Sequence, residues 1–194
     1  MPKGKPDGEA SRWKCTCAYD GTGYAGWQKQ PNGQAVQDKI EEGLREIFGM
    51  EIRTVGSGRT DAGVHAKGQV FHFDAPWTHP VDSLLQAMRV NFPEGVLPLG
   101  VEPVADDFHA LLWAKGKRYR YRAHRGWAMP EVSRFVCSLK HKPLDLGMMR
   151  EAAGFLVGEL DYSAFSASRG GEEEAESKVR KVWLLDLILS LIHI

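Results

Sequence analysis

The order of apolar patterns over the first hundred residues is the feature that most restricts the fold. From Trp13 to Tyr19, large side chains alternate with smaller or polar ones, which predicts a half-buried strand. Between Val36 and Phe48, apolar residues recur at helical spacing, with Glu41, Glu42 and Arg45 on the polar side, and Gly49 ends the helix. The same reasoning predicts strands over 52–55, 69–73 and within 96–104, and a second helix over 81–88. This β-α-β-β-α-β order predicts a four-stranded antiparallel sheet with helices on one face.

The residues after Asp107 predict a second, less complete α+β half. Strands are expected over about 115–124, over 135–139 and over 179–188, with a helix that starts near Pro143 and extends to Val157. The closing hairpin and helix that would match the first half are missing. We therefore predict a flexible tail over 1–11, an N-terminal domain with the catalytic loop over 12–106, and an incomplete C-terminal domain over 107–194.

Charge is balanced overall but uneven along the chain. The formal net charge is zero, which argues against indiscriminate nucleic-acid binding, yet 115–125 holds six Lys and Arg residues and no acidic ones. In an extended strand, Tyr119 and Tyr121 would share one face, opposite Arg118 and Arg120. That arrangement suits base stacking and phosphate contact. A core role for the tyrosines beside a solvated basic face is the alternative, and both remain open.

The three cysteines do not have the spacing of a disulfide framework or a metal site. Cys15 and Cys17 fall on one face of a strand, Cys137 stands apart, and neither Cys-x-x-Cys nor metal-ligand spacing of histidines occurs. We therefore expect no metal and a reducing compartment. The N-terminal residues lack the apolar core of a secretory signal. The apolar tail over 187–194 is far shorter than the roughly 20 residues that a membrane span requires.

The loop from Gly56 to His65 carries the most distinctive chemistry. Three glycines predict a tightly shaped loop, and Arg59 and Asp61 are close enough in sequence to form a charge pair facing one cleft. The plain alternative is a hairpin turn with solvated charges. Asp61 is a candidate nucleophile, general base or structural cap. No second carboxylate, Ser-His-Asp order or phosphate-binding glycine motif accompanies it. A second glycine-rich loop, over 24–30, either contacts RNA or latches aromatic side chains onto the core.

Several motifs occur in a characteristic order along the chain. They are Tyr19–Gln30, Gly58–Ala66 followed by Gly68–Val70, Asn91–Pro93, Phe108–Ala110, Lys117–Tyr121, Leu144–Asp145 and Gly158–Phe165. This series resembles the TruA family of tRNA pseudouridine synthases from about Trp13 to Trp183, which is nearly the whole chain. The nine-residue Gly58–Ala66 segment, which looks like the catalytic signature of that family, is the most specific part.

The resemblance implies a pseudouridine synthase fold, an α+β fold in which two similar ferredoxin-like (RRM-like) halves share a continuous antiparallel sheet around a basic cleft. It implies an isomerase that converts uridine to pseudouridine at positions 38 to 40 of the tRNA anticodon stem-loop, with the target flipped out. A cytoplasmic homodimer without cofactor, metal or membrane is expected.

The resemblance also implies roles for individual residues. Asp61 matches the catalytic aspartate, Arg59 the arginine that pairs with it, and Tyr119 the tyrosine that stacks on the target base. The residues expected to bind substrate are Tyr24, Gln28, Gly58, Thr60, His65, Arg118 and Arg120.

The end of the sequence departs from the family pattern. The family continues to a Phe-Leu-x-x-Met-Val-Arg-like segment that lines the active site, and the residues from Leu187 to Ile194 do not resemble it. We therefore expect a C-terminally truncated sequence. The alternative to an active enzyme is an RNA-binding module of the same fold that lacks turnover.

Overall fold

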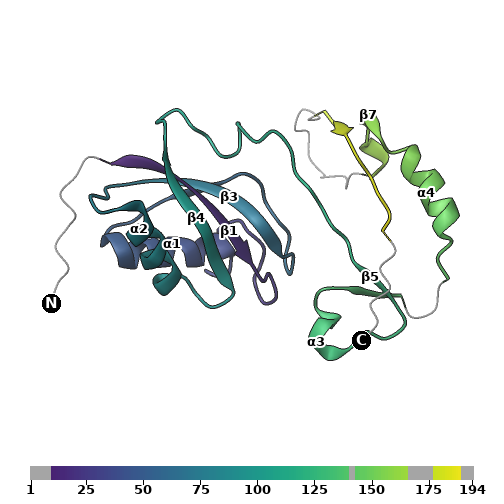
Figure 1. Ribbon diagram of the computed structural model, residues 1–194, viewed down its shortest axis with the longest axis horizontal. Helices are drawn as coiled ribbons and strands as arrows, with labels where there is room; N and C mark the ends of the chain where they lie inside the picture. Colours follow the sequence, from purple (N-terminus) through teal and green to yellow (C-terminus); the bar gives the residue numbers. More distant parts are fainter. Residues whose placement is uncertain (1–9, 140–142, 166–176, 189–194) are drawn as a thin grey trace. The chain divides into compact units, whose positions relative to one another are not determined.

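The computed structural model describes residues 10–139, 143–165 and 177–188. The chain divides into two compact units, Met1–Arg120 and Tyr121–Ile194 (Figure 1). The predicted tail over 1–11 lies outside the described residues except for its last two, and the first strand already begins at Ser11. None of the described helices has the length and apolar character needed to cross a membrane.

A four-stranded antiparallel sheet forms the centre of the first unit and confirms the predicted element order. Figure 1 shows both helices on one side of this sheet, whose strand order is β2-β3-β1-β4. The elements are β1 (Ser11–Tyr19), α1 (Val36–Phe48), β2 (Thr54–Gly56), β3 (Ala66–Ala75), α2 (Val81–Asn91) and β4 (Val96–Val104). Gly49 ends α1 in the left-handed conformation, with φ of 67°, as its position predicted.

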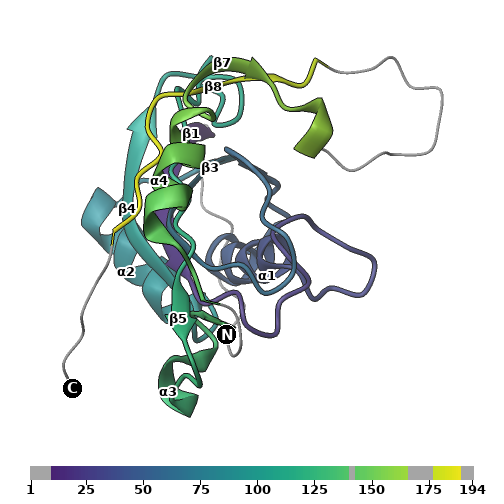
Figure 2. The same cartoon turned by 90° about the vertical axis from the view of Figure 1, so that its right-hand side faces the viewer.

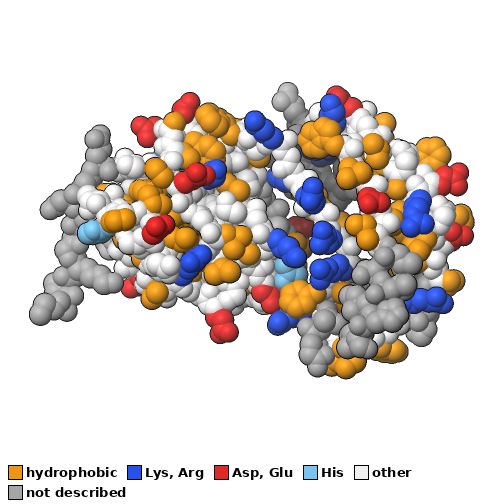
Figure 3. Space-filling model, in the orientation of Figure 1, with side chains coloured by type: hydrophobic (Ala, Val, Ile, Leu, Met, Phe, Trp, Pro, Cys, Tyr) orange, Lys and Arg blue, Asp and Glu red, His pale blue; other side chains and the backbone are white. Residues whose placement is uncertain are grey.

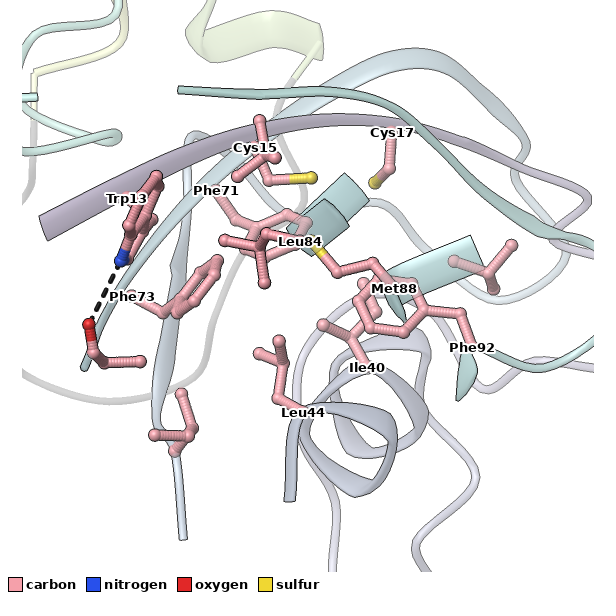
Figure 4. Close-up of a cluster of buried hydrophobic side chains, with 14 of the residues drawn as sticks. Trp13, Cys15, Cys17, Ile40, Leu44, Phe71, Phe73, Leu84, Met88 and Phe92 are labelled. Atoms are coloured by element: carbon pink, nitrogen blue, oxygen red, sulfur yellow. Dashed lines mark hydrogen bonds between the residues drawn. The ribbon is translucent and has the colours of Figure 1, made fainter. Parts of the chain in front are cut away.

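The core lies between this sheet and the two helices (Figure 4). Alternate residues of β1 point into it, and Cys15 pairs in register with Phe71 of β3. Leu44 of α1 and Leu84 of α2 close the core from the helix side, and both are fully buried. Apolar burial of this kind is the main favourable contribution to folding, at roughly 25 cal/mol per Å². The first unit therefore has the packed core that its sequence pattern predicted.

The cysteines of β1 behave as small apolar core residues. Cys15 and Cys17 are buried on the same face and are not disulfide-bonded. Burial raises the pKa of the Cys17 thiol to about 12, and it raises the pKa of Cys15 as well. Neither thiol is therefore a reactive thiolate at neutral pH.

A short segment after β4 packs against the first unit, so this unit extends beyond Asp106. The Ala110 amide donates to His72 Nδ1 at 3.2 Å, and the Phe108 ring meets the His72 ring edge-on. Arg12 donates to the Phe108 carbonyl at 3.0 Å. Burial, with Arg12 nearby, lowers the pKa of His72, so its neutral ring remains able to accept the Ala110 bond.

We expect the ion pair between Arg12 and Asp74 to give the first unit a small acid sensitivity. Two Arg12 nitrogens each donate to one Asp74 oxygen at 2.8 Å, and these bonds lower the pKa of Asp74. A lowered folded-state pKa stabilises the fold above the unfolded value, about 3.9, and that contribution disappears as pH falls through the folded-state pKa. Because Asp74 is 50% exposed, Asp74→Asn should reduce the free energy of unfolding by no more than about 1 kcal/mol at pH 7. Urea denaturation at successive pH values tests this, and a difference that persists unchanged in acid would contradict it.

The second unit does not show the predicted continuation of one sheet. Its described strands form two separate pairs, parallel β5-β6 and antiparallel β7-β8, and Figure 2 shows the latter two side by side. The elements are β5 (Ala123–Arg125), α3 (Pro130–Ser133), β6 (Cys137–Leu139), α4 (Leu146–Gly154), β7 (Gly158–Asp161), the 3-10 turn η1 (Ser163–Phe165) and β8 (Val179–Val182). The predicted two-half arrangement around a continuous sheet is therefore not confirmed.

Three predicted strands of the second half are shorter than expected. The strand expected over 115–124 begins only at Ala123, the one over 135–139 begins at Cys137, and the one over 179–188 ends at Val182. An extended segment becomes a strand only where a neighbour accepts and donates its backbone hydrogen bonds. An isolated two-stranded pair also buries little apolar surface, and it is therefore only marginally stable. Apolar side chains here, such as Phe155 at 75%, are accordingly exposed.

Candidate active site

The Gly56–His65 loop connects two antiparallel neighbours, β2 and β3, and its stem is held by hydrogen bonds. The Ser57 amide donates to the Val70 carbonyl at 2.7 Å. The Gln69 side-chain amide donates to the Gly58 carbonyl at 2.7 Å, and the Ser57 hydroxyl donates to Gln69 Oε1 at 2.9 Å. The loop is thus a hairpin connection, as the plain alternative supposed, but it is tightly shaped rather than slack.

A second loop, over 20–30 between β1 and α1, is hydrogen-bonded to the first. The Trp27 amide donates to the Thr60 carbonyl at 3.0 Å, directly beside Asp61. The Gly63 amide donates to the Tyr24 carbonyl at 3.2 Å. The sequence indicated both loops separately, and the structure joins them into one frame.

Two side chains complete this frame. The Tyr19 hydroxyl lies 2.8 Å from Thr60 Oγ1, and burial raises the pKa of Tyr19, so it is a neutral phenol at physiological pH. His65 Nδ1 accepts from the Gly21 amide at 3.1 Å and lies 3.0 Å from Asp20 Oδ1. Thr60 and His65, which we expected to bind substrate, therefore hold the two loops together within the protein.

Glycines permit the close approach of the two loops. A Cβ on Gly21 would lie 2.0 Å from the Val64 carbonyl oxygen. A Cβ on Gly26 would lie 2.6 Å from the Thr60 carbonyl oxygen, and its φ of +95° is also unfavourable for other residues. Both contacts are with backbone atoms, which cannot rotate aside as a side chain could.

A buried polar network beneath the second loop was not predicted. Glu41 is only 7% exposed, although helical spacing placed it on the polar side of α1. Its carboxylate accepts from Lys29 Nζ at 2.8 Å, the Thr54 amide at 2.9 Å and the Thr54 hydroxyl at 3.1 Å. Gln37, one turn earlier, accepts from the Lys29 amide at 3.0 Å. A buried carboxylate with these donors is satisfied, and it fixes the loop that contacts Thr60.

Asp61 lies at an exposed turn of this frame. The Val64 amide donates to its backbone carbonyl at 3.2 Å, and its side chain is exposed. Arg59 is exposed as well, and the described residues contain no ion pair between it and Asp61. The structure of the protein without RNA therefore does not show the predicted charge pair. An ion pair between two solvated side chains is worth only about 0 to 1 kcal/mol, too little to hold both in one geometry.

The aromatic side chains of the second loop pack in or against the core. Trp27 is 2% exposed and stacks near Tyr19, with ring centroids 6.0 Å apart. Tyr24 is half-buried against the same core, and burial raises its pKa. Of the two alternatives for this loop, the aromatic latch is the one observed. Gln28 is exposed and remains a predicted substrate contact.

The basic segment after the first unit's core is exposed along its length. Tyr119 is 68% exposed and Tyr121 93%, so neither is a core residue. Arg118 and Arg120 are exposed too, and with no strand over 115–122 the predicted alternation of faces is absent. Figure 3 shows exposed Lys and Arg side chains on this face of the molecule. The expectation that these tyrosines and arginines meet RNA remains a prediction.

Metal-ligating side chains do not cluster in groups of three or more within residues 10–139, 143–165 and 177–188. What the described loops offer instead is an accessible carboxylate on a rigid backbone frame. Such a group can act as a nucleophile or base toward a substrate that enters from solvent.

Comparison with known proteins gives a consistent match. Residues 16–111 match the family model described as tRNA pseudouridine synthase, a range that includes both loops. The chain is 38% identical over 183 residues to tRNA pseudouridine synthase A of Neisseria meningitidis serogroup C (strain 053442), covering 94% of this chain and 68% of the relative. The protein of the same name from Myxococcus xanthus is 39% identical, covering 88% and 64%. The one from Dechloromonas aromatica (strain RCB) is 44% identical, covering 77% and 57%. The chain thus spans roughly three fifths to two thirds of these relatives.

Proposed function

Because the chain belongs to the TruA family of tRNA pseudouridine synthases, we propose that it isomerises uridine to pseudouridine in tRNA with Asp61 as the attacking carboxylate. The observation that carries this proposal is the placement of Asp61. It is exposed at the turn of a family signature loop whose backbone is held by Thr60, Gly63 and the stem. A held carboxylate that reaches solvent is what an attack on an extruded nucleotide requires.

The reaction conserves all heavy atoms of the substrate. The N1–C1′ glycosidic bond breaks, the base turns, and a C5–C1′ bond forms in its place. C5 then loses its hydrogen to solvent and N1 gains a proton, so the product is an isomer of the substrate. The Asp61 carboxylate would form a transient covalent bond, either at C1′ of the sugar or at the base, and it is released unchanged. Both points of attack are compatible with its exposed position.

Arg59 and Tyr119 have proposed roles that depend on RNA. Arg59 would pair with Asp61 and help to hold the flipped-out state, since a nearby cation favours the ionised carboxylate. Tyr119 would stack on the extruded base. The exposure of both side chains in the protein alone supports these roles, because each remains available to an incoming strand.

The proposed substrate is the anticodon stem-loop at positions 38 to 40, and the proposed working form is a cytoplasmic homodimer without cofactor. Support for these finer points is the resemblance of the motifs to the family. The absence of acidic residues over 115–125 adds support for an RNA partner, because phosphate contacts are made mainly by Lys and Arg.

Tritium release provides a direct test. tRNA transcribed with uridine labelled at C5 should lose tritium to water when incubated with the protein, because C5 loses its hydrogen on forming the new bond. A matched transcript with cytidine at positions 38 to 40 should release none. Release from the matched transcript would contradict the proposed positions. Tight tRNA binding without any release would instead favour the RNA-binding module without turnover.

A further inference from the structure

The Lys117 side chain lies across Gly58, at the base of the Gly56–His65 loop. A Cβ on Gly58 would lie 2.3 Å from Lys117 Nζ, 2.9 Å from its Cε and 3.7 Å from its Cδ. The alkyl stem and the ammonium therefore occupy the space that any other side chain at position 58 would fill. Both residues belong to the first unit, and Gly58 is three residues before Asp61.

The loop backbone at Gly58, over which Lys117 lies, is held by side-chain hydrogen bonds. The Gly58 carbonyl accepts from the Gln69 amide, and Gln69 also accepts from the Ser57 hydroxyl. Gln69 is itself buried, at 8% exposed. The Lys117 ammonium therefore lies over backbone that is itself held by hydrogen bonds near the turn that carries Asp61.

Lys117 has no anionic partner within the protein as far as it is described. None of the ion pairs in residues 10–139, 143–165 and 177–188 includes Lys117, and Asp61 does not reach it. The neighbouring sequence supplies no carboxylate, since 115–125 is wholly free of acidic residues. The exposed Lys117 ammonium is therefore available to an anionic group of a bound ligand.

We propose that the Lys117 ammonium binds a phosphodiester group of the substrate RNA strand above Gly58, an inference that rests on the proposed function. A phosphate contact fixes the register of a strand without reading its sequence. Held at Gly58, that phosphate would place the adjoining sugar beside the Asp61 turn. Gly58, which has no side chain, leaves room for the Lys117 ammonium at this position.

The test measures binding of an anticodon stem-loop RNA by fluorescence anisotropy from 50 to 200 mM KCl, without any assay of turnover. Loss of one phosphate contact should reduce the slope of log affinity against log salt by about 0.7 to 0.9. For Lys117→Gln, the affinity deficit relative to wild type should therefore shrink about threefold between the two salt concentrations. Lys117→Arg should keep the wild-type slope, because the charge is retained.

Lys115→Gln is the matched control, since it removes the same charge two residues earlier in the same segment. Its slope should stay closer to wild type than that of Lys117→Gln. Equal slopes for Lys117→Gln and Lys115→Gln would mean that only the net charge of the segment matters, and this result would overturn the inference. An absence of RNA binding by the wild-type chain would overturn it as well. A slope specific to Lys117 in a protein that releases no tritium would uphold this inference while the proposed isomerisation fails. Tritium release together with an unchanged slope in Lys117→Gln would uphold the proposed isomerisation and overturn this inference.

Discussion

Asp61→Ala is expected to lower the rate of pseudouridine formation by between about 10³ and 10⁶-fold while leaving the protein folded. Removal of a catalytic acid or base typically costs 10² to 10⁴, and removal of a covalent nucleophile costs up to about 10⁶. Folding should be unaffected because the Asp61 side chain is exposed and only its backbone carbonyl takes part in the turn. Single-turnover tritium release measures the rate, and thermal unfolding checks the fold.

The matched control for this variant is Glu46→Gln, which removes an exposed carboxylate from α1, away from both loops. It should retain the wild-type rate. Asp61→Asn should be as slow as Asp61→Ala, since the amide keeps the size of the side chain but lacks the nucleophilic charge. An Asp61→Ala protein with a rate within tenfold of wild type would refute the assignment of Asp61 as the attacking group. Equal RNA affinity in all three variants would locate the loss in chemistry rather than binding.

Gly26→Ala is expected to reduce turnover about a hundredfold and to destabilise the first unit. Its Cβ would overlap the Thr60 carbonyl oxygen at 2.6 Å, so the loop next to Asp61 must shift. A misplacement of about 1 Å can cost 10² in rate. The positive φ adds about 1 to 2 kcal/mol of strain and the overlap about 1 to 3 kcal/mol. Single-turnover rates and urea denaturation measure the two effects separately.

Gly33→Ala separates backbone strain from the loss of loop contact. Gly33 also has a positive φ, +67°, but a Cβ there would meet no atom within 4 Å. This variant should lose about 1 to 2 kcal/mol of stability and keep the wild-type rate per folded molecule. If Gly26→Ala and Gly33→Ala showed the same rate, the contact between the two loops would have no part in positioning Asp61.

Local patterns predicted the first unit well, because its elements carry strong periodicity and capping signals. Alternation from Trp13 to Tyr19 corresponds to a strand whose alternate residues are buried, and the Val36–Phe48 helix ends at Gly49 as expected. The same patterns predicted too long a strand over 115–124. There the residues favour an extended backbone, but pairing depends on a partner strand elsewhere in the chain.

Side-chain contacts between residues far apart in the sequence could not be predicted from local patterns. Helical spacing could not show that Glu41 is buried, because its donors, Lys29 of the 20–30 loop and Thr54 of β2, are brought to it by tertiary packing. Spacing also suggested an ion pair between Arg59 and Asp61, which the described residues do not show in the protein without RNA, where both side chains are exposed.

By itself, the sequence determined the element order of the first unit, the loop that carries Asp61 and the family to which the chain belongs. Those features depend on local periodicity and on a contiguous motif, both of which are written in neighbouring residues. Only the tertiary structure decided that the 20–30 loop holds Thr60, that Glu41 supports that loop, and that Lys117 rests on Gly58. Each of these contacts joins residues far apart in the chain, and distance in space is set by packing of the whole unit rather than by local preference.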